Sequence, residues 1–228
     1  MIHYHGTPIT PVTEIQKLAG RNFCVSFERP DQVKRCHDIG QSVMLDNGAF
    51  TVWVKGKMMD WTKYYRWCEP WLDYHTTWAV IPDVIDGTEE DNDELLKQWP
   101  HGDKGSPVWH LHESFDRLRE LCDQFSRVCF GSSGMYSNPG SSAWHRRVSE
   151  AFNTIAPSGT VPAWIHMLRG LKFSGSDYPF ASVDSAYVGR SHRRDGGVEL
   201  LAGYWDGKQC PARWAGSHQM NLEGLCTD

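Results

Sequence analysis

The chain has 228 residues, of which 40% are hydrophobic and 22% are charged. These proportions are ordinary for a globular protein and exclude a disordered one, and the length fits one large domain better than two. The net charge of −5 at pH 7 argues against a protein that coats nucleic acid nonspecifically, so contact with DNA or RNA would have to come from a local basic patch.

The chain carries no feature that directs it to a membrane or an oxidising compartment. No run approaches the roughly 18 apolar residues that a membrane span needs. The first residues lack the pattern of a signal peptide. The seven cysteines are odd in number and scattered, with no CxxC pair, which argues against a disulfide framework. We therefore expect a cytoplasmic protein that does not associate with membranes.

Short apolar runs recur along the chain, each followed by a helical pattern. The predicted strands span residues 2–5, 22–26, 42–46, 77–82, 107–111, 127–131, 162–167 and 180–184. Between the first two strands, Thr10 and Pro11 predict a helix N-cap with proline at the first helical position, and Gly20 ends that helix. Thr88 precedes an acidic stretch that suits the N-terminus of another helix. Residues 114–126 and 141–155 each place apolar side chains on one helical face.

Strands that alternate with helices predict parallel pairing and a sheet covered on its faces. Eight such units fit a compact, closed (β/α)8 barrel of the TIM type. We expect a single α/β domain over residues 1–228, with residues 189–228 as a basic, irregular C-terminal extension. An open doubly wound sheet is the alternative, but no glycine-rich phosphate loop follows the first strand.

Several predicted strands end on polar groups that can do chemistry. They are His3, His5, Asp46, Asp83, His110, His112, the turn 131–134, His166 and Asp184. In a barrel, the active site forms where strands run out into the following loops. A single aspartate there could be a structural residue whose hydrogen bonds are all made. Several carboxylates and histidines that are partly buried together at one rim reduce the stability of the fold unless they are paired. The pattern therefore indicates an active site at this rim.

Five of the segments at this rim form an ordered set. They read LDNGAF (45–50), IPDV (81–84), FGSSG (130–134), IHMLRG (165–170) and SVDSAYVGR (182–190). In this order on a barrel they resemble the tRNA-guanine transglycosylases. They resemble still more the relatives of that family in bacteriophages and bacteria that insert 7-deazaguanines into DNA. The resemblance covers roughly residues 40–190.

The resemblance implies a glycosyltransferase that exchanges guanine in a nucleic acid for a 7-deazaguanine base. By the family's pattern, Asp184 matches the nucleophilic aspartate of a D-x5-R motif, and Arg190 matches its basic partner. Asp46 matches the aspartate at the reaction centre, and Asp83 matches the aspartate that reads the edge of the base.

The resemblance also implies the remaining walls of the base pocket. Ser132, Ser133 and Gly134 match a glycine-rich turn whose backbone contacts the carbonyl oxygen of the base. His166 falls in a run that helps to line the base pocket, and Phe50 closes the segment that begins at Leu45 and is assigned to base binding with it.

This chemistry requires the same residue types for physical reasons. A guanine edge presents a ring N–H and an NH2 group, two donors that one carboxylate can accept together. Cleavage of an N-glycosidic bond develops positive charge on the sugar, which a carboxylate stabilises or captures. A second carboxylate moves a proton between the leaving and the entering base. Two inversions give net retention, and water must be excluded.

The choice of nucleic acid rests on size and local charge. The chain is much smaller than tRNA-modifying relatives, so we expect DNA rather than tRNA as the partner. A compact size would also suit a bacteriophage protein, which would act in the host cytoplasm. Arg190, Arg193 and Arg194 predict a phosphate clamp, with a solvated tail as the alternative.

No resident cofactor is expected. The structural zinc site of the family is missing, and Cys210, His218 and Cys226 have the spacing of no known zinc motif, so a degenerate remnant of that site is only the alternative.

Two other functions remain open from the sequence. The first is a zinc-dependent amidohydrolase, in which His3, His5, His110 or His112, His166 and Asp184 would hold the metal. The second is a barrel that binds nucleic acid or a protein without catalysis.

Overall fold

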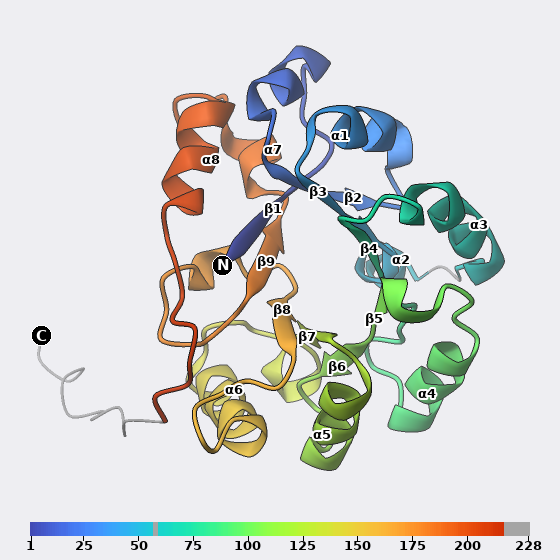
Figure 1. Ribbon diagram of the computed structural model, residues 1–228, viewed down its shortest axis with the longest axis vertical. Helices are drawn as coiled ribbons and strands as arrows, with labels where there is room; N and C mark the ends of the chain where they lie inside the picture. Colours follow the sequence, from blue (N-terminus) through green and yellow to red (C-terminus); the bar gives the residue numbers. More distant parts are fainter. Residues whose placement is uncertain (57–58, 217–228) are drawn as a thin grey trace, which may run out of the picture.

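The computed structural model describes residues 1–56 and 59–216 and contains a nearly closed, barrel-like sheet of parallel strands (Figure 1). Nine strands pair in the order β5-β4-β3-β2-β1-β9-β8-β7-β6. Their bounds are β1 (Ile2–Gly6), β2 (Asn22–Ser26), β3 (Ser42–Asp46), β4 (Thr77–Val80), β5 (Gly105–Ser106), β6 (Val108–His110), β7 (Arg127–Gly131), β8 (Trp164–Met167) and β9 (Ser182–Ser185). All the predicted apolar runs thus contribute strands to one parallel sheet.

The fifth predicted strand, 107–111, begins at Pro107, and the structure has one short strand on each side of this proline. β5 pairs with β4 and β6 pairs with β7. The two edge strands of the sheet are therefore consecutive in the chain, with Pro107 between them. Proline has no N–H group to donate to a ladder, although the Pro107 carbonyl still accepts from the Cys129 N–H at 2.8 Å. The predicted single strand 107–111 is therefore corrected to two short strands that begin at Gly105.

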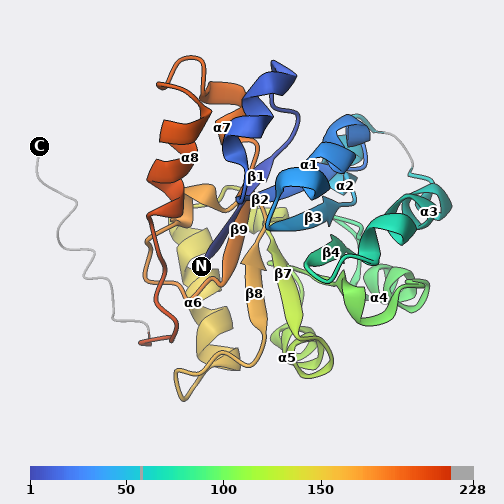
Figure 2. The same cartoon turned by 45° about the horizontal axis from the view of Figure 1, so that its top comes forward.

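Helices surround the sheet on its outer face (Figures 1 and 2). The α-helices are α1 (Val33–Ile39), α2 (Ala49–Val54), α3 (Trp61–Leu72), α4 (Glu89–Lys97), α5 (Phe115–Gln124), α6 (Ser142–Ile155), α7 (Tyr187–Ser191) and α8 (Val198–Asp206). The 3-10 helices are η1 (Val12–Leu18), η2 (Pro30–Gln32), η3 (Gly102–Lys104), η4 (Gly134–Tyr136) and η5 (Leu171–Phe173). Thr88 caps α4 as predicted, in a reciprocal capping box with Asp91.

Two predictions about local structure were wrong. The segment after Thr10 is a 3-10 helix whose N-cap is Pro11, because Pro11 is in an extended conformation and lies outside the helix. Its fully buried residues, Ile15 and Leu18, are three positions apart, the spacing that aligns side chains in a 3-10 helix. The stretch from residue 189 is not irregular throughout, since α8 forms there and packs on η1 and β1.

Alternate strand residues fill the inside of the barrel, and the others pack under the helices. The inner cluster consists of Tyr4, Cys24, Met44, Trp78, Val80, Val108 and Cys129. Larger apolar clusters lie between the sheet and the helices on either side. Polar residues that share this inward orientation therefore project above the inner cluster at the carboxyl ends of the strands. Within the described ranges, no helix has the length and apolar character needed to cross a membrane.

Candidate active site

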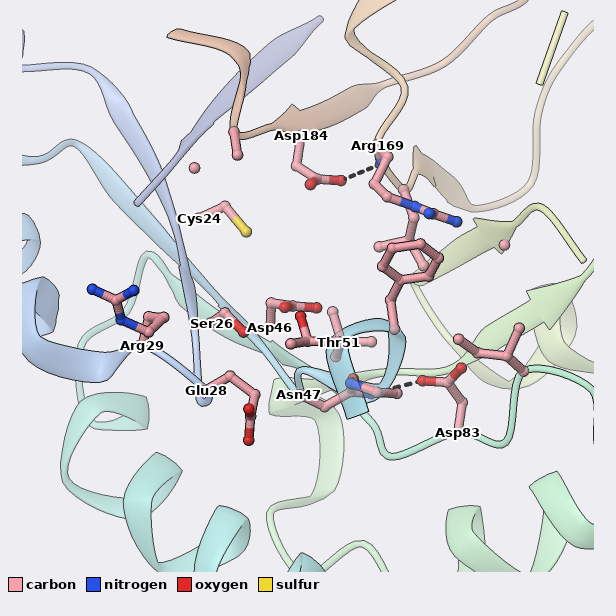
Figure 3. A pocket seen from close by; sticks show the side chains of 18 of the residues that line it. Cys24, Ser26, Glu28, Arg29, Asp46, Asn47, Thr51, Asp83, Arg169 and Asp184 are labelled. Atoms are coloured by element: carbon pink, nitrogen blue, oxygen red, sulfur yellow. Dashed lines mark hydrogen bonds between the residues drawn. The ribbon is translucent and has the colours of Figure 1, made fainter. Parts of the chain in front are cut away.

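Three aspartates from distant parts of the sequence line one cavity at the carboxyl ends of the strands. Asp46 ends β3, Asp83 follows β4, and Asp184 belongs to β9; Figure 3 shows their side chains around the same space. The cavity has a volume of about 400 Å³. This lies within the roughly 300–1,000 Å³ of small-molecule sites. The structure therefore brings together the three carboxylates that the sequence singles out.

The surroundings of Asp46 raise the pKa of its carboxyl group. Burial raises its pKa to about 7, and the nearby charges of Asp184 and Asp83 act in the same direction. The nearby Ser26 hydroxyl and Gly48 N–H oppose the rise in pKa. A carboxyl group whose pKa lies near neutrality can both give and take a proton at physiological pH. Asp46 is therefore suited to general acid–base chemistry.

Asp184 is held by donors on one of its two oxygens. Its Oδ1 accepts from the Arg169 backbone N–H at 2.7 Å and lies 3.3 Å from Nε2 of His166. Among the described residues, no group donates a hydrogen bond to Oδ2. The Asp184 side chain is only 12% exposed, and it faces the cavity (Figure 3). One oxygen thus fixes the side chain while the other remains available for chemistry.

Asn47 and His110 hold the Asp83 side chain in place. The sequence analysis did not predict either contact. The Asn47 amide donates to Oδ1 of Asp83 at 2.7 Å, and Nε2 of His110 lies 2.9 Å from Oδ2 (Figure 3 draws the Asn47 contact). Asn47 also donates to the Ile81 carbonyl at 2.9 Å and accepts from the Ala49 N–H at 2.8 Å. Because Asn47 follows Asp46 directly, it connects two of the three carboxylates.

Asn47→Ala is expected to destabilise the protein by about 1–3 kcal/mol, because the buried Ile81 carbonyl and Ala49 N–H would lose their partner. Urea denaturation of the two proteins measures the free-energy difference. The surface variant Asp38→Asn, whose exposed side chain pairs with Lys34, serves as a control with little expected change. An Asn47→Ala protein as stable as the wild type would contradict this role.

The glycine-rich turn after β7 is only partly at the cavity. Gly131 and Ser132 line it, and the Ser132 hydroxyl accepts from Nε1 of Trp144 at 2.9 Å. Ser133 is instead bonded to Nδ1 of His112 at 2.7 Å, and Gly134 begins η4. Ser133 and Gly134 were predicted to contact the base, yet neither lines the cavity.

His166 also differs from its predicted position. It is fully buried beneath Asp184, packed edge-on against Tyr4 and Trp78, and does not line the cavity. The physical reason is its height in the barrel: its backbone pairs with Ser182, one layer below Asp184. His166 therefore contacts the carboxylate and not the space above it.

The rim of the cavity carries an aromatic ring and several cationic side chains, Arg29, Lys55, Arg169 and Arg190. The Arg169 guanidinium lies 3.8 Å from the centre of the Phe50 ring, and Phe50 is 42% exposed. Arg169 has a φ of 54°, which is uncommon for a residue with a side chain and directs its N–H at Asp184. Arg190 lines the cavity as well. Arg169 was missed because nothing in IHMLRG marks it as a rim residue.

The other two predicted phosphate-binding arginines are engaged elsewhere. Arg193 donates to the Thr10 carbonyl at 3.1 Å, and Arg194 pairs with Asp195 at 3.0 Å. Neither lines the cavity. Of the three arginines in the predicted clamp, Arg190 alone lines the cavity.

Neither set of candidate metal ligands is assembled at the cavity. His3 and His5 point outward from the barrel. On that outer side, His5 lies 3.0 Å from Asp206 and His3 contacts Ser174. Cys210 contacts the Phe173 carbonyl, while His218 and Cys226 lie outside the described residues. In residues 1–56 and 59–216, no group of three histidine, cysteine or acidic side chains is arranged to hold a metal ion.

Comparison with protein-family models, with curated proteins and with solved structures found no match to this chain. Its function therefore has to be inferred from the geometry and electrostatics of the cavity.

Proposed function

We propose that the protein is a transglycosylase that exchanges guanine in a nucleic acid for a 7-deazaguanine base through a covalent glycosyl-aspartate intermediate. The observation that carries the proposal is the meeting of Asp46, Asp83 and Asp184 in one cavity, each in a different environment. We also propose that β5 and β6 are one interrupted strand, which makes the fold a (β/α)8 barrel with 3-10 helices after β1 and β8.

Asp184 acts as the nucleophile in this proposal. Its Oδ2 forms a bond to the anomeric carbon of the sugar while the bond from that carbon to the guanine nitrogen breaks. Asp46, protonated below its pKa of about 7, gives its proton to the departing base. It then removes the ring proton of the entering 7-deazaguanine, whose nitrogen displaces Asp184 from the sugar. Each step inverts the anomeric carbon, so the product retains its configuration.

Asp83 recognises the base in this proposal. A carboxylate has about four acceptor positions, and the contacts with Asn47 and His110 leave further ones for the ring N–H and NH2 of guanine. Gly131 and Ser132 face the remaining edge of the base. The partly exposed Phe50 ring offers a surface on which a base can stack. In this structure the Arg169 guanidinium lies over that ring.

The form of the rim favours DNA over tRNA. The helices that follow β3 and β9 are only six and five residues long, so they provide little surface for a large folded RNA. Among the described residues, four cationic side chains line the cavity, Arg29, Lys55, Arg169 and Arg190, which suits a short stretch of phosphate backbone. A nucleotide turned out of its strand would reach the cavity at the expense of its stacking energy.

The test is a base-exchange assay. The purified protein is incubated with single-stranded DNA, duplex DNA or tRNA, each with radiolabelled guanine. We expect label to enter DNA with release of an equal amount of unlabelled guanine and without abasic sites. Label transfer to none of the three would overturn the proposal. Transfer to tRNA alone would overturn the preference for DNA.

A further inference from the structure

A continuous chain of hydrogen bonds runs beneath the cavity from β8 to Asp184. Nε1 of Trp164 donates to the Ser182 hydroxyl at 2.9 Å, and that hydroxyl lies 2.8 Å from Nδ1 of His166. Nε2 of His166 in turn lies 3.3 Å from Oδ1 of Asp184. Ser182 and His166 are both fully buried, so water does not compete for these bonds.

The donor and acceptor in each bond follow from Trp164, the first residue of this chain of hydrogen bonds. An indole N–H can only donate, so the Ser182 oxygen accepts from Trp164 and its own proton is left for His166. Among the described residues the Ser182 hydroxyl contacts no other acceptor for its proton, so donation to His166 leaves Nδ1 as the unprotonated nitrogen. The Asp184 carboxylate beside Nε2 favours the ring proton at that nitrogen. In that tautomer, His166 donates to Asp184.

The surroundings of His166 keep its ring neutral. Burial lowers the pKa of His166, and the positive charge of Arg127 lowers it further, although Asp184 opposes both effects. The other faces of the ring contact Tyr4 and Trp78. Arg127 itself lies over Trp78 and Trp164 at the opposite end of the barrel interior from the cavity.

We infer that Trp164 and Ser182 fix His166 as the Nε2–H tautomer, and that His166 is thereby a positioning residue for Asp184. His166 and the Arg169 N–H then hold the same oxygen, Oδ1, so Oδ2 is the oxygen that faces the substrate. The role in orienting a nucleophile rests on the proposed function, whereas the tautomer does not.

The tautomer is measured directly by NMR. In protein labelled with [15N]histidine, long-range 1H–15N correlations identify which ring nitrogen carries the proton, and the His166 signals are those missing from His166→Gln. We expect His166 as the neutral Nε2–H ring from pH 7.0 to 8.5. An Nδ1–H ring or an imidazolium in that range would overturn the inference. Trp164→Phe keeps the ring packing and removes the first donor, and should produce a mixture of tautomers.

The positioning role is measured with two matched variants in the base-exchange assay. Glutamine places its amide nitrogen near the position of Nε2, whereas asparagine is too short to reach Asp184. We expect His166→Gln to keep kcat within about tenfold and His166→Asn to lose about 10- to 100-fold in kcat, with the KM for the free base unchanged in both. Equal kcat values for the two variants would overturn the positioning role. If the wild type exchanges no base, the proposed function fails, and the NMR result still decides the tautomer.

Discussion

Asp184→Asn is expected to abolish base exchange, with a loss of at least about 10³-fold in kcat, because an amide oxygen cannot form the covalent bond to the sugar. The substitution keeps the shape of the side chain and leaves an oxygen that can accept from the Arg169 N–H. The protein should therefore fold normally, and circular dichroism should show an unchanged thermal transition near neutral pH or one shifted upward.

The intermediate provides a second measurement on the same residue. Wild-type protein denatured during turnover should carry a sugar-linked oligonucleotide on the peptide that contains Asp184, as detected by mass spectrometry. The Asp184→Asn protein should carry none, and the surface control Asp38→Asn should behave as the wild type. Label exchange by Asp184→Asn at the wild-type rate would show that another group is the nucleophile.

Asp46→Asn is expected to slow base exchange by about 10²- to 10⁴-fold while making the protein more stable at alkaline pH. The pKa of Asp46 is about 7 in the folded protein, above its usual value near 4. Between these two pH values the folded state holds a proton that the unfolded chain has released, so stability falls as the pH rises from about 4 to 7. Asparagine is neutral throughout and removes this dependence.

The size of the stability effect follows from the pKa difference. At about 1.4 kcal/mol per pKa unit, Asp46→Asn should be up to about 4 kcal/mol more stable than the wild type at pH 8, and similar to it near pH 4. Denaturant titrations at the two pH values measure this change, with Asp38→Asn as a control that should show no such gain. A destabilised Asp46→Asn protein at pH 8 would contradict the raised pKa.

The sequence predicted the sheet well because its strands are short apolar runs with clear ends. It also predicted that Asp46, Asp83 and Asp184 would meet, because the carboxyl ends of parallel strands lie at one edge of a sheet. Pro107 separates β5 from β6, and apolar patterning does not reveal this break. The break depends on the N–H group that proline lacks, whereas the strand prediction used hydrophobicity.

The remainder of the site depended on information that a one-dimensional pattern lacks. Whether His166 reaches the cavity or lies one layer below it is set by the stagger of neighbouring strands, which only the register with Ser182 defines. Arg169 reaches the rim through a positive φ that no local composition required. Asn47 was visible beside Asp46, but its contact with Asp83 bridges two strands and so became evident only in three dimensions.

The position of β1 between β2 and β9 has a consequence for how the chain acquires its fold. Ile2 pairs with Ser182, and His5 on the same strand is bonded to Asp206 of α8, so contacts at β1 join segments that are far apart in the chain. Contacts of such long sequence separation carry a high entropic cost of loop closure, and they slow folding relative to chains with local contacts. Asp184 lies on the strand that completes this long-range pairing, so chemical competence should be among the final properties to emerge during folding.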